Sequence, residues 1–229
     1  MVNANIHKTI LIIILKEIYS DPLLRNILGF KGGTAAMLFY RLPRLSVDLD
    51  FDLLDTEKKL KIIIKLKKIL PQFGTVKEAI EKRDTIFFLL NYTKGERNLK
   101  IEISKRPSQA KYIQKNFLGI SMLIMKKEDM LANKLSAVLT RKKFASRDLF
   151  DLWYFLKNNW QITENIIKKN CHLSLSDALK KTRIQIKTIK NTHLLSGLGD
   201  LLNNKQKTWV KEKLVNELLF QLELYEKTH

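Results

Sequence analysis

Three aspartates alternate with apolar residues in one short segment, from Val47 to Asp52. This alternation is typical of a β-strand, in which Asp48, Asp50 and Asp52 lie on one face. Asp48 and Asp50 are about 6.5 Å apart along such a strand. At an effective dielectric constant near 20, their charges repel by roughly 2.5 kcal/mol. A divalent cation reverses this repulsion, so we expect Asp48 and Asp50 to bind Mg²⁺ or Mn²⁺ together with substrate phosphates.

Another carboxylate belongs to a second alternating segment, Leu99 to Ser104. If this segment pairs with the aspartate strand, Glu102 faces the same side. Glu102 is then a third metal ligand, or it polarises an attacking hydroxyl in a two-metal displacement. For Asp52 we favour a simpler interpretation, a carboxylate on a sheet face that meets water.

A glycine pair precedes the acidic segment. Residues 30–33 are expected to form a turn-like link, and Thr34 is expected to cap a helix that runs to Arg41. Free backbone N–H groups at a helix start favour phosphate, and glycine permits close approach. We therefore expect Gly32, Gly33 and Thr34 to bind nucleotide phosphates. The Walker spacing occurs nowhere in the chain. Arg41 and Arg44 are expected to be solvated residues after the helix, or to face a nucleotide or RNA.

In the second half of the chain, helical spacing brings charged residues together. Arg147 and Asp151 are four residues apart and could form an ion pair. Asp148 follows a predicted cap, Ser146, where a carboxylate complements the helix dipole. Spacing alone does not separate these structural roles from a functional one.

The chain is strongly basic, with 42 Lys and Arg against 23 Asp and Glu, a net charge of +19. Such a charge attracts polyanions, although a need for solubility gives the same excess. The single cysteine, Cys171, excludes an internal disulfide and a multi-cysteine zinc site, which favours a reducing cytoplasm. The apolar run from Ile10 to Leu15 is far shorter than the ~20 residues that span a bilayer, so no membrane association is expected.

The remaining patterns predict an α+β protein. Helices are expected at 6–19, after Pro22 and at 56–70, and strands at 76–82, 85–91, 99–104 and 120–125, with a hairpin turn at 93–96. From residue 126 onward only helical periodicity occurs. We therefore predict a mixed β-sheet domain flanked by helices at 1–125, followed by a helical bundle at 126–229.

Several segments together resemble the AbiEii/AbiGii toxin family of nucleotidyltransferases. They are Lys31-Gly32-Gly33-Thr34-Ala35-Ala36, Arg44-Leu45-Ser46-Val47-Asp48-Leu49-Asp50-Phe51, Lys134-Leu135-Ser136-Ala137 and Arg147-Asp148-Leu149-Phe150-Asp151-Leu152. The resemblance implies a nucleotidyltransferase-type sheet and a functional Lys and Asp at Lys134 and Asp148. Lys134 would bind the triphosphate, and Asp148 would orient that lysine or the acceptor, with Asp151 as second choice. Glu102 stands where members commonly place an aspartate.

The function that the resemblance implies is Mg²⁺-dependent transfer of a nucleoside monophosphate from an NTP to an acceptor hydroxyl. It implies RNA as the acceptor, with the 3′ end of tRNA as the target, and a toxin of a toxin-antitoxin or abortive-infection system with a cognate antitoxin protein. An alternative from another class is a nucleic-acid-binding protein that keeps the fold but has lost turnover. The +19 charge and Glu102 favour that alternative.

Overall fold

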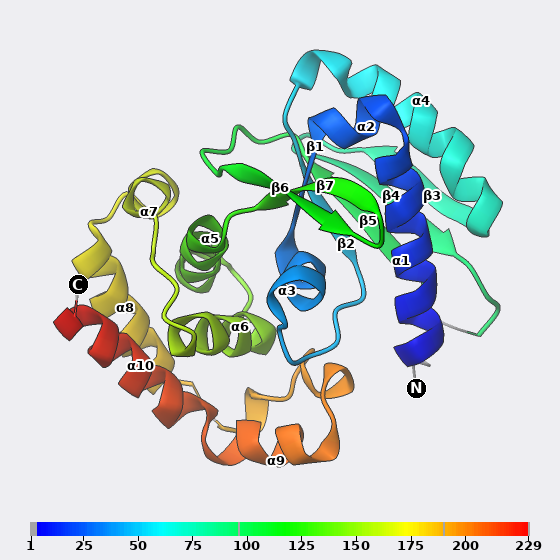
Figure 1. The fold of residues 1–229 in the computed structure, drawn as a ribbon. Helices are drawn as coiled ribbons and strands as arrows, with labels where there is room; N and C mark the ends of the chain where they lie inside the picture. Colours follow the sequence, from blue (N-terminus) through cyan, green and yellow to red (C-terminus); the bar gives the residue numbers. More distant parts are fainter. Residues whose placement is uncertain (1–3, 96, 190, 229) are drawn as a thin grey trace. The chain divides into compact units, whose positions relative to one another are not determined.

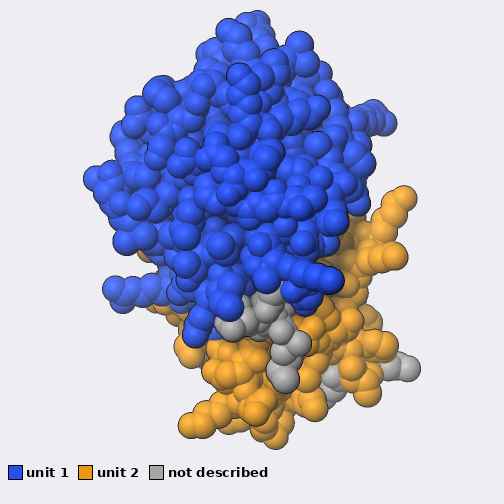
Figure 2. Space-filling view, turned by 90° about the vertical axis from the view of Figure 1, so that its right-hand side faces the viewer, with its two compact units in different colours: residues 1–125 blue, residues 126–229 orange. Residues whose placement is uncertain are grey.

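The computed structural model describes residues 4–95, 97–189 and 191–228, which form two compact units, 1–125 and 126–229. Figure 1 gives the order of the elements, and Figure 2 colours the two units separately. Within the described residues, no helix is long and apolar enough to cross a membrane.

Unit 1 is a mixed seven-stranded sheet with helices. Short 3-10 helices lie on either side of α4, at Thr56–Lys58 and Leu70–Phe73. The regular elements of this unit are α1 (Ala4–Ser20), α2 (Pro22–Ile27), β1 (Leu28–Lys31), α3 (Gly32–Tyr40), β2 (Leu49–Leu53), α4 (Lys59–Ile69), β3 (Thr75–Glu81), β4 (Thr85–Asn91), β5 (Leu99–Ser104), β6 (Tyr112–Phe117) and β7 (Ile120–Met125).

The sheet has the order β3-β4-β5-β2-β1-β7-β6. β1 pairs antiparallel with β2 and parallel with β7, and β2 pairs parallel with β5. The three strands β5, β2 and β1 therefore occupy the centre. The alternation of β2 gives it one apolar face, on which Phe51 contacts Tyr19 of α1 and Phe30 of β1, and Phe30 also contacts Phe39 of α3. The aspartates of β2 point to the opposite face.

Unit 2 contains only helices among its described residues. Its aromatic core includes Trp153, 4.2 Å from Trp209 between ring centroids, and Phe155 stacked on Trp160. Two 3-10 helices, Asn191–His193 and Gly199–Leu201, connect α8 to α9. The α-helices are α5 (Lys127–Thr140), α6 (Ser146–Lys157), α7 (Glu164–Cys171), α8 (Leu175–Lys187), α9 (Asn204–Glu212) and α10 (Leu214–Thr228).

The α+β class and the strands at 85–91, 99–104 and 120–125 are confirmed. The turn-like link at 30–33 was wrong, because Leu28–Lys31 is a central strand and α3 begins directly after it at Gly32. Residues 112–117 form a further strand, β6, that the patterns did not predict. The predicted hairpin joins β4 to β5, but Glu96 in its turn lies outside the described residues.

Candidate active site

The acidic face of β2 lies in the middle of the sheet, beside Glu102. β2 pairs with β5 in parallel register, so that Asp50 is opposite Glu102 and Asp52 is opposite Ser104. Because neighbours in register point to the same face, the carboxylates of Asp50 and Glu102 share one side of the sheet. Asp48 directly precedes β2. The sequence placed Glu102 on the same side as the aspartates only if these two strands pair, and they do.

The glycine turn contacts this acidic face directly. Gly32 has a φ of +78°, and a Cβ atom at this position would lie 2.4 Å from Asp50 Oδ2. Only glycine accepts both this backbone conformation and this approach. The first residue of α3 and the Asp50 carboxylate are therefore adjacent, which brings the predicted phosphate turn and a predicted metal ligand together.

Gly33 leaves room for a buried arginine. A Cβ atom on Gly33 would lie 2.6 Å from Arg44 Nη2 and 2.8 Å from Ser46 Oγ. Arg44 is 5% exposed and donates from Nη1 to the Leu45 carbonyl at 2.9 Å. The expectation of a solvated arginine was wrong for Arg44, because its guanidinium packs against the start of α3. Arg41 is exposed, as expected.

Thr34 is buried in the first turn of α3 and does not cap it, since the N-cap residue is Lys31. Its Oγ1 lies 2.5 Å from the Asp48 carbonyl and 2.9 Å from Ser46 Oγ. A carbonyl only accepts, so the single Thr34 hydroxyl proton goes to Asp48, and Ser46 donates to Thr34. Thr34 thus fixes the backbone of Asp48, and the expectation that it caps the helix was wrong.

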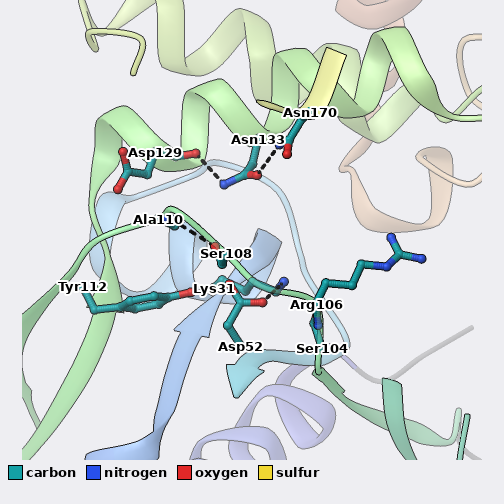
Figure 3. A network of polar contacts seen from close by, with 10 residues as sticks. All are labelled: Lys31, Asp52, Ser104, Arg106, Ser108, Ala110, Tyr112, Asp129, Asn133 and Asn170. Atoms are coloured by element: carbon teal, nitrogen blue, oxygen red, sulfur yellow. Dashed lines mark hydrogen bonds and ion pairs between the residues drawn. The ribbon is translucent and has the colours of Figure 1, made fainter. Parts of the chain in front are cut away.

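Asp52 is not a water-facing residue, because it is 3% exposed. Its Oδ1 forms an ion pair with Lys31 Nζ at 2.5 Å, and Tyr112 of β6 donates its hydroxyl proton to Oδ2. Figure 3 shows the Lys31 and Tyr112 side chains reaching Asp52. The interpretation of Asp52 as solvated was wrong, since a strand that the sequence patterns did not reveal covers it.

The carboxylates of Asp48 and Asp50 are of a type that suits a hard divalent cation. Asp48 Oδ1 is buried and, within the described part of the chain, has no hydrogen-bond partner. A buried carboxylate oxygen without a donor is costly unless a cation or a water molecule satisfies it. Among the described residues no group of three or more Asp, Glu, His or Cys side chains forms a ready metal cluster. Two carboxylates plus phosphate oxygens suffice for Mg²⁺, so the residues fit a cation that binds with its nucleotide.

In unit 2, Lys134 of α5 lies among buried carboxylates of α6. Its Nζ is 2.8 Å from Asp148 Oδ1 and 2.8 Å from Asp151 Oδ2. The lysine side chain is 16% exposed, whereas Asp148 and Asp151 are 2% and 0% exposed. Arg141 Nε lies 3.1 Å from Asp148 Oδ2, close enough for an ion pair, although this oxygen lacks a partner of hydrogen-bond geometry. The two positive charges of Lys134 and Arg141 therefore balance the two negative charges of Asp148 and Asp151 in this cluster.

Two contacts of α6 differ from those that the sequence patterns suggested. Asp151 pairs with Lys134 and not with Arg147, which makes no ion pair among the described residues. Ser146 does not cap α6; Ala145 holds that position, and Ser146 Oγ donates to the His193 carbonyl at 2.9 Å. The roles of Lys31, Tyr112 and Arg44 were missed. Of these three residues, only Lys31 had a signal in the sequence, which is its position directly before the glycine pair.

Comparison with solved structures shows the same fold in two proteins of Helicobacter pylori. A protein described as a candidate nucleotidyltransferase has a TM-score of 0.63 and 24% identity, covering 98% of this chain and 95% of its own. A second, JHP933, has a TM-score of 0.55 and 23% identity with the same coverage. At these identities the likeness shows the fold alone. No curated protein matches the chain.

The family model described as "Nucleotidyl transferase AbiEii toxin, Type IV TA system" matches residues 13–223, which covers both units and nearly the whole chain. The resemblance that the glycine turn and the aspartate strand indicated is thereby confirmed. The chain belongs to the AbiEii family of nucleotidyltransferase toxins of type IV toxin-antitoxin systems.

Proposed function

We propose that this protein transfers a nucleoside monophosphate from a nucleoside triphosphate to a hydroxyl of RNA, with the 3′ end of tRNA as the acceptor. The oxygen of that hydroxyl bonds to the α-phosphorus, the bond to the β-phosphate oxygen breaks, and pyrophosphate leaves. In a type IV toxin-antitoxin system, this modification of RNA would be the toxic event, and a cognate antitoxin would counteract it. The net charge of +19 supports a polyanionic acceptor.

The observation that carries the proposal is the contact between Gly32 and the Asp50 carboxylate. Phosphoryl transfer needs phosphates held by backbone N–H groups within reach of carboxylates that bind a divalent cation. The first turn of α3 offers these N–H groups, and Asp50 lies against it. Asp48, whose Oδ1 has no donor among the described residues, supplies a second carboxylate.

We assign roles to the remaining residues as part of this proposal. Mg²⁺, when bound by Asp48 and Asp50, supplies positive charge that neutralises the phosphates and favours ionisation of the attacking hydroxyl. Glu102, opposite Asp50, polarises that hydroxyl or completes the metal ligands. Thr34 fixes the Asp48 backbone, and Gly32 and Gly33 admit the phosphates. Lys134, held by Asp148 and Asp151, contributes its charge to triphosphate binding.

The test is incubation of the purified protein with Mg²⁺, total RNA and each α-labelled NTP in turn, followed by denaturing gel electrophoresis. We expect label on a discrete RNA band of tRNA size with one or more nucleotides. Asp50→Asn should abolish this label. Asp84→Asn is the matched control, because it makes the same change at an exposed carboxylate that pairs with Arg106. Label that persists in Asp50→Asn would contradict the proposal.

A different outcome would favour the nucleic-acid-binding alternative. In that case no nucleotide labels any RNA, while RNA is retained with equal affinity in Mg²⁺ and in EDTA. Electrostatic binding to phosphates depends on salt and needs no active-site cation, so this equality separates binding from turnover.

A further inference from the structure

The ammonium group of Lys31 lies on the acidic face, beside the glycine turn. Lys31 is the last residue of β1 and is opposite Asp50 in the antiparallel pairing with β2. Its ion pair runs diagonally to Asp52, at 2.5 Å, and not straight across to Asp50. The positive charge is therefore held two residues along β2 from the carboxylate expected to bind the cation.

Asp52 can hold this lysine because the carboxylate is itself fixed. Its second oxygen accepts a hydrogen bond from the Tyr112 hydroxyl. The Tyr112 ring covers Gly29, where a Cβ atom would lie 2.3 Å from the ring atom Cε1. Gly29 is opposite Asp52 in the β1–β2 pairing, so the missing side chain makes space for the ring. Lys31, Asp52 and Tyr112, which are labelled in Figure 3, belong to three strands, β1, β2 and β6.

The lysine retains donor capacity toward solvent. An ammonium group has three N–H donors. Among the described residues, Asp52 Oδ1 is the only hydrogen-bond acceptor of the Lys31 ammonium group. The Lys31 side chain is 28% exposed, whereas that of Asp52 is 4% exposed. The buried carboxylate thus orients a partly exposed cation, which is the arrangement of a positioned anion ligand.

We propose that Lys31 binds the triphosphate of the nucleotide substrate and that Asp52 and Tyr112 are positioning residues that set its ammonium group. This inference rests on the proposed function, and it adds a phosphate ligand to the glycine turn. Gly32, which directly follows Lys31, touches the Asp50 carboxylate. A phosphate bound at the start of α3 is therefore within the range of a lysine side chain anchored at the N-cap.

A purely structural role for Lys31 predicts different behaviour. As a counter-ion for buried Asp52, Lys31 would affect the stability of unit 1 but not its affinity for phosphates. Loss of the Tyr112 hydroxyl would then also leave the Kd for nucleotide unchanged, whether or not residue 31 is a lysine. The two roles are separated by nucleotide affinity and by the coupling between Lys31 and Tyr112.

The experiment is calorimetric titration of the full chain, without acceptor RNA, with ATP, GTP, CTP or UTP in Mg²⁺. Lys31→Met should raise the Kd of the bound nucleotide about 10-fold, the loss of one charge-assisted phosphate contact. Lys31→Arg should restore most of the affinity. Tyr112→Phe keeps the ring over Gly29 and should raise the Kd about 3-fold, but should have no further effect in the Lys31→Met background.

Lys65→Met is the matched control, because Lys65 forms an ion pair with Asp21 in the same unit. It should leave the Kd unchanged, and thermal unfolding of every variant identifies loss of fold. Nucleotide binding that is equal in wild type and folded Lys31→Met would overturn this inference alone. If Lys31→Met weakens nucleotide binding but the wild-type protein transfers no nucleotide to any RNA, the proposed function is overturned and Lys31 is supported as a ligand. Wild-type protein that binds none of the four nucleotides would overturn both.

Discussion

Asp50 and Glu102 stand opposite each other in the parallel pairing of β2 with β5, with like charges on the same face of the sheet. Like charges directly opposite each other destabilise a sheet. A cation that binds between them reverses the sign of this interaction. The Asp50–Glu102 pair should therefore lower the stability of the metal-free protein and raise the stability of the metal-bound protein.

Glu102→Gln tests this relationship, because it removes the charge and keeps the shape. In EDTA the variant should be more stable than wild type by about 0.5 kcal/mol, the size of a cross-strand charge effect. It should also lose transfer activity and gain less stability from added Mg²⁺ than wild type does. Thermal unfolding in EDTA and in Mg²⁺ measures both effects. Equal Mg²⁺-dependent stabilisation of the two proteins would show that Glu102 does not contribute to cation binding.

Gly32→Ala should abolish transfer and destabilise unit 1 by about 2 kcal/mol, because it combines a positive φ with a clash against Asp50 Oδ2. Gly119→Ala is the matched control. Gly119 has a φ of +81°, but a Cβ atom there would meet no atom within 4 Å. It should cost only the backbone strain, about 1 kcal/mol, and leave transfer intact. Denaturant unfolding and the RNA-labelling assay compare the two variants. Equal losses of stability and of transfer in Gly32→Ala and Gly119→Ala would show that the contact with Asp50 affects neither.

The sequence predicts those parts of the site whose signal is local. The alternation of β2 and β5 placed Asp50 and Glu102 on strands, and the pairing of these strands brings them together. β1 escaped prediction because Leu28–Lys31 is four residues long, includes a glycine and is almost wholly buried, so it has no alternation of polarity.

Long-range contacts account for three other errors. Asp52 looked solvated because the tyrosine that covers it lies 60 residues away in the chain, on a strand of mixed polarity. Arg44 looked exposed because nothing local indicates that Gly33 leaves space for its guanidinium. Spacing of charges likewise could not show that Asp151 pairs with Lys134 on another helix.

Lys134→Met should lower the stability of unit 2 by about 3 kcal/mol, because it leaves Asp148 and Asp151 buried without their shared cation. Adding Asp151→Asn should restore part of this stability, since Asp148 keeps its ion pair with Arg141. If Lys134 also binds the triphosphate, the double variant should regain stability without regaining nucleotide affinity. Urea unfolding and nucleotide titration of the single and double variants measure stability and nucleotide affinity. If the double variant recovers both properties, Lys134 has a structural role only.

The acid stability of unit 1 should depend on Asp21. Burial raises the pKa of this carboxyl, but hydrogen bonds from Lys65 and from the N–H groups of Leu24 and Leu23 outweigh it and hold the pKa below its ordinary value of 3.8. A lowered folded-state pKa stabilises the protein above the unfolded value, and this contribution is lost as pH falls below 3.8 through the folded pKa. Asp21→Asn retains a good N-cap for α2 and removes the charge, so it should cost about 0.5 kcal/mol at pH 7 and almost nothing in strong acid.

Asp21→Ala separates the cap from the charge. It removes both, and should cost about 1 kcal/mol more than Asp21→Asn at neutral pH, where the carboxylate accepts from the N–H groups of Leu23 and Leu24. The difference between the two variants should persist into acid, because an asparagine cap does not titrate, whereas the difference between wild type and Asp21→Asn should vanish. Urea unfolding at pH 7, 5, 3 and 2 measures both differences. A deficit of Asp21→Asn that is independent of pH would mean that its ion pair with Lys65 does not stabilise the fold.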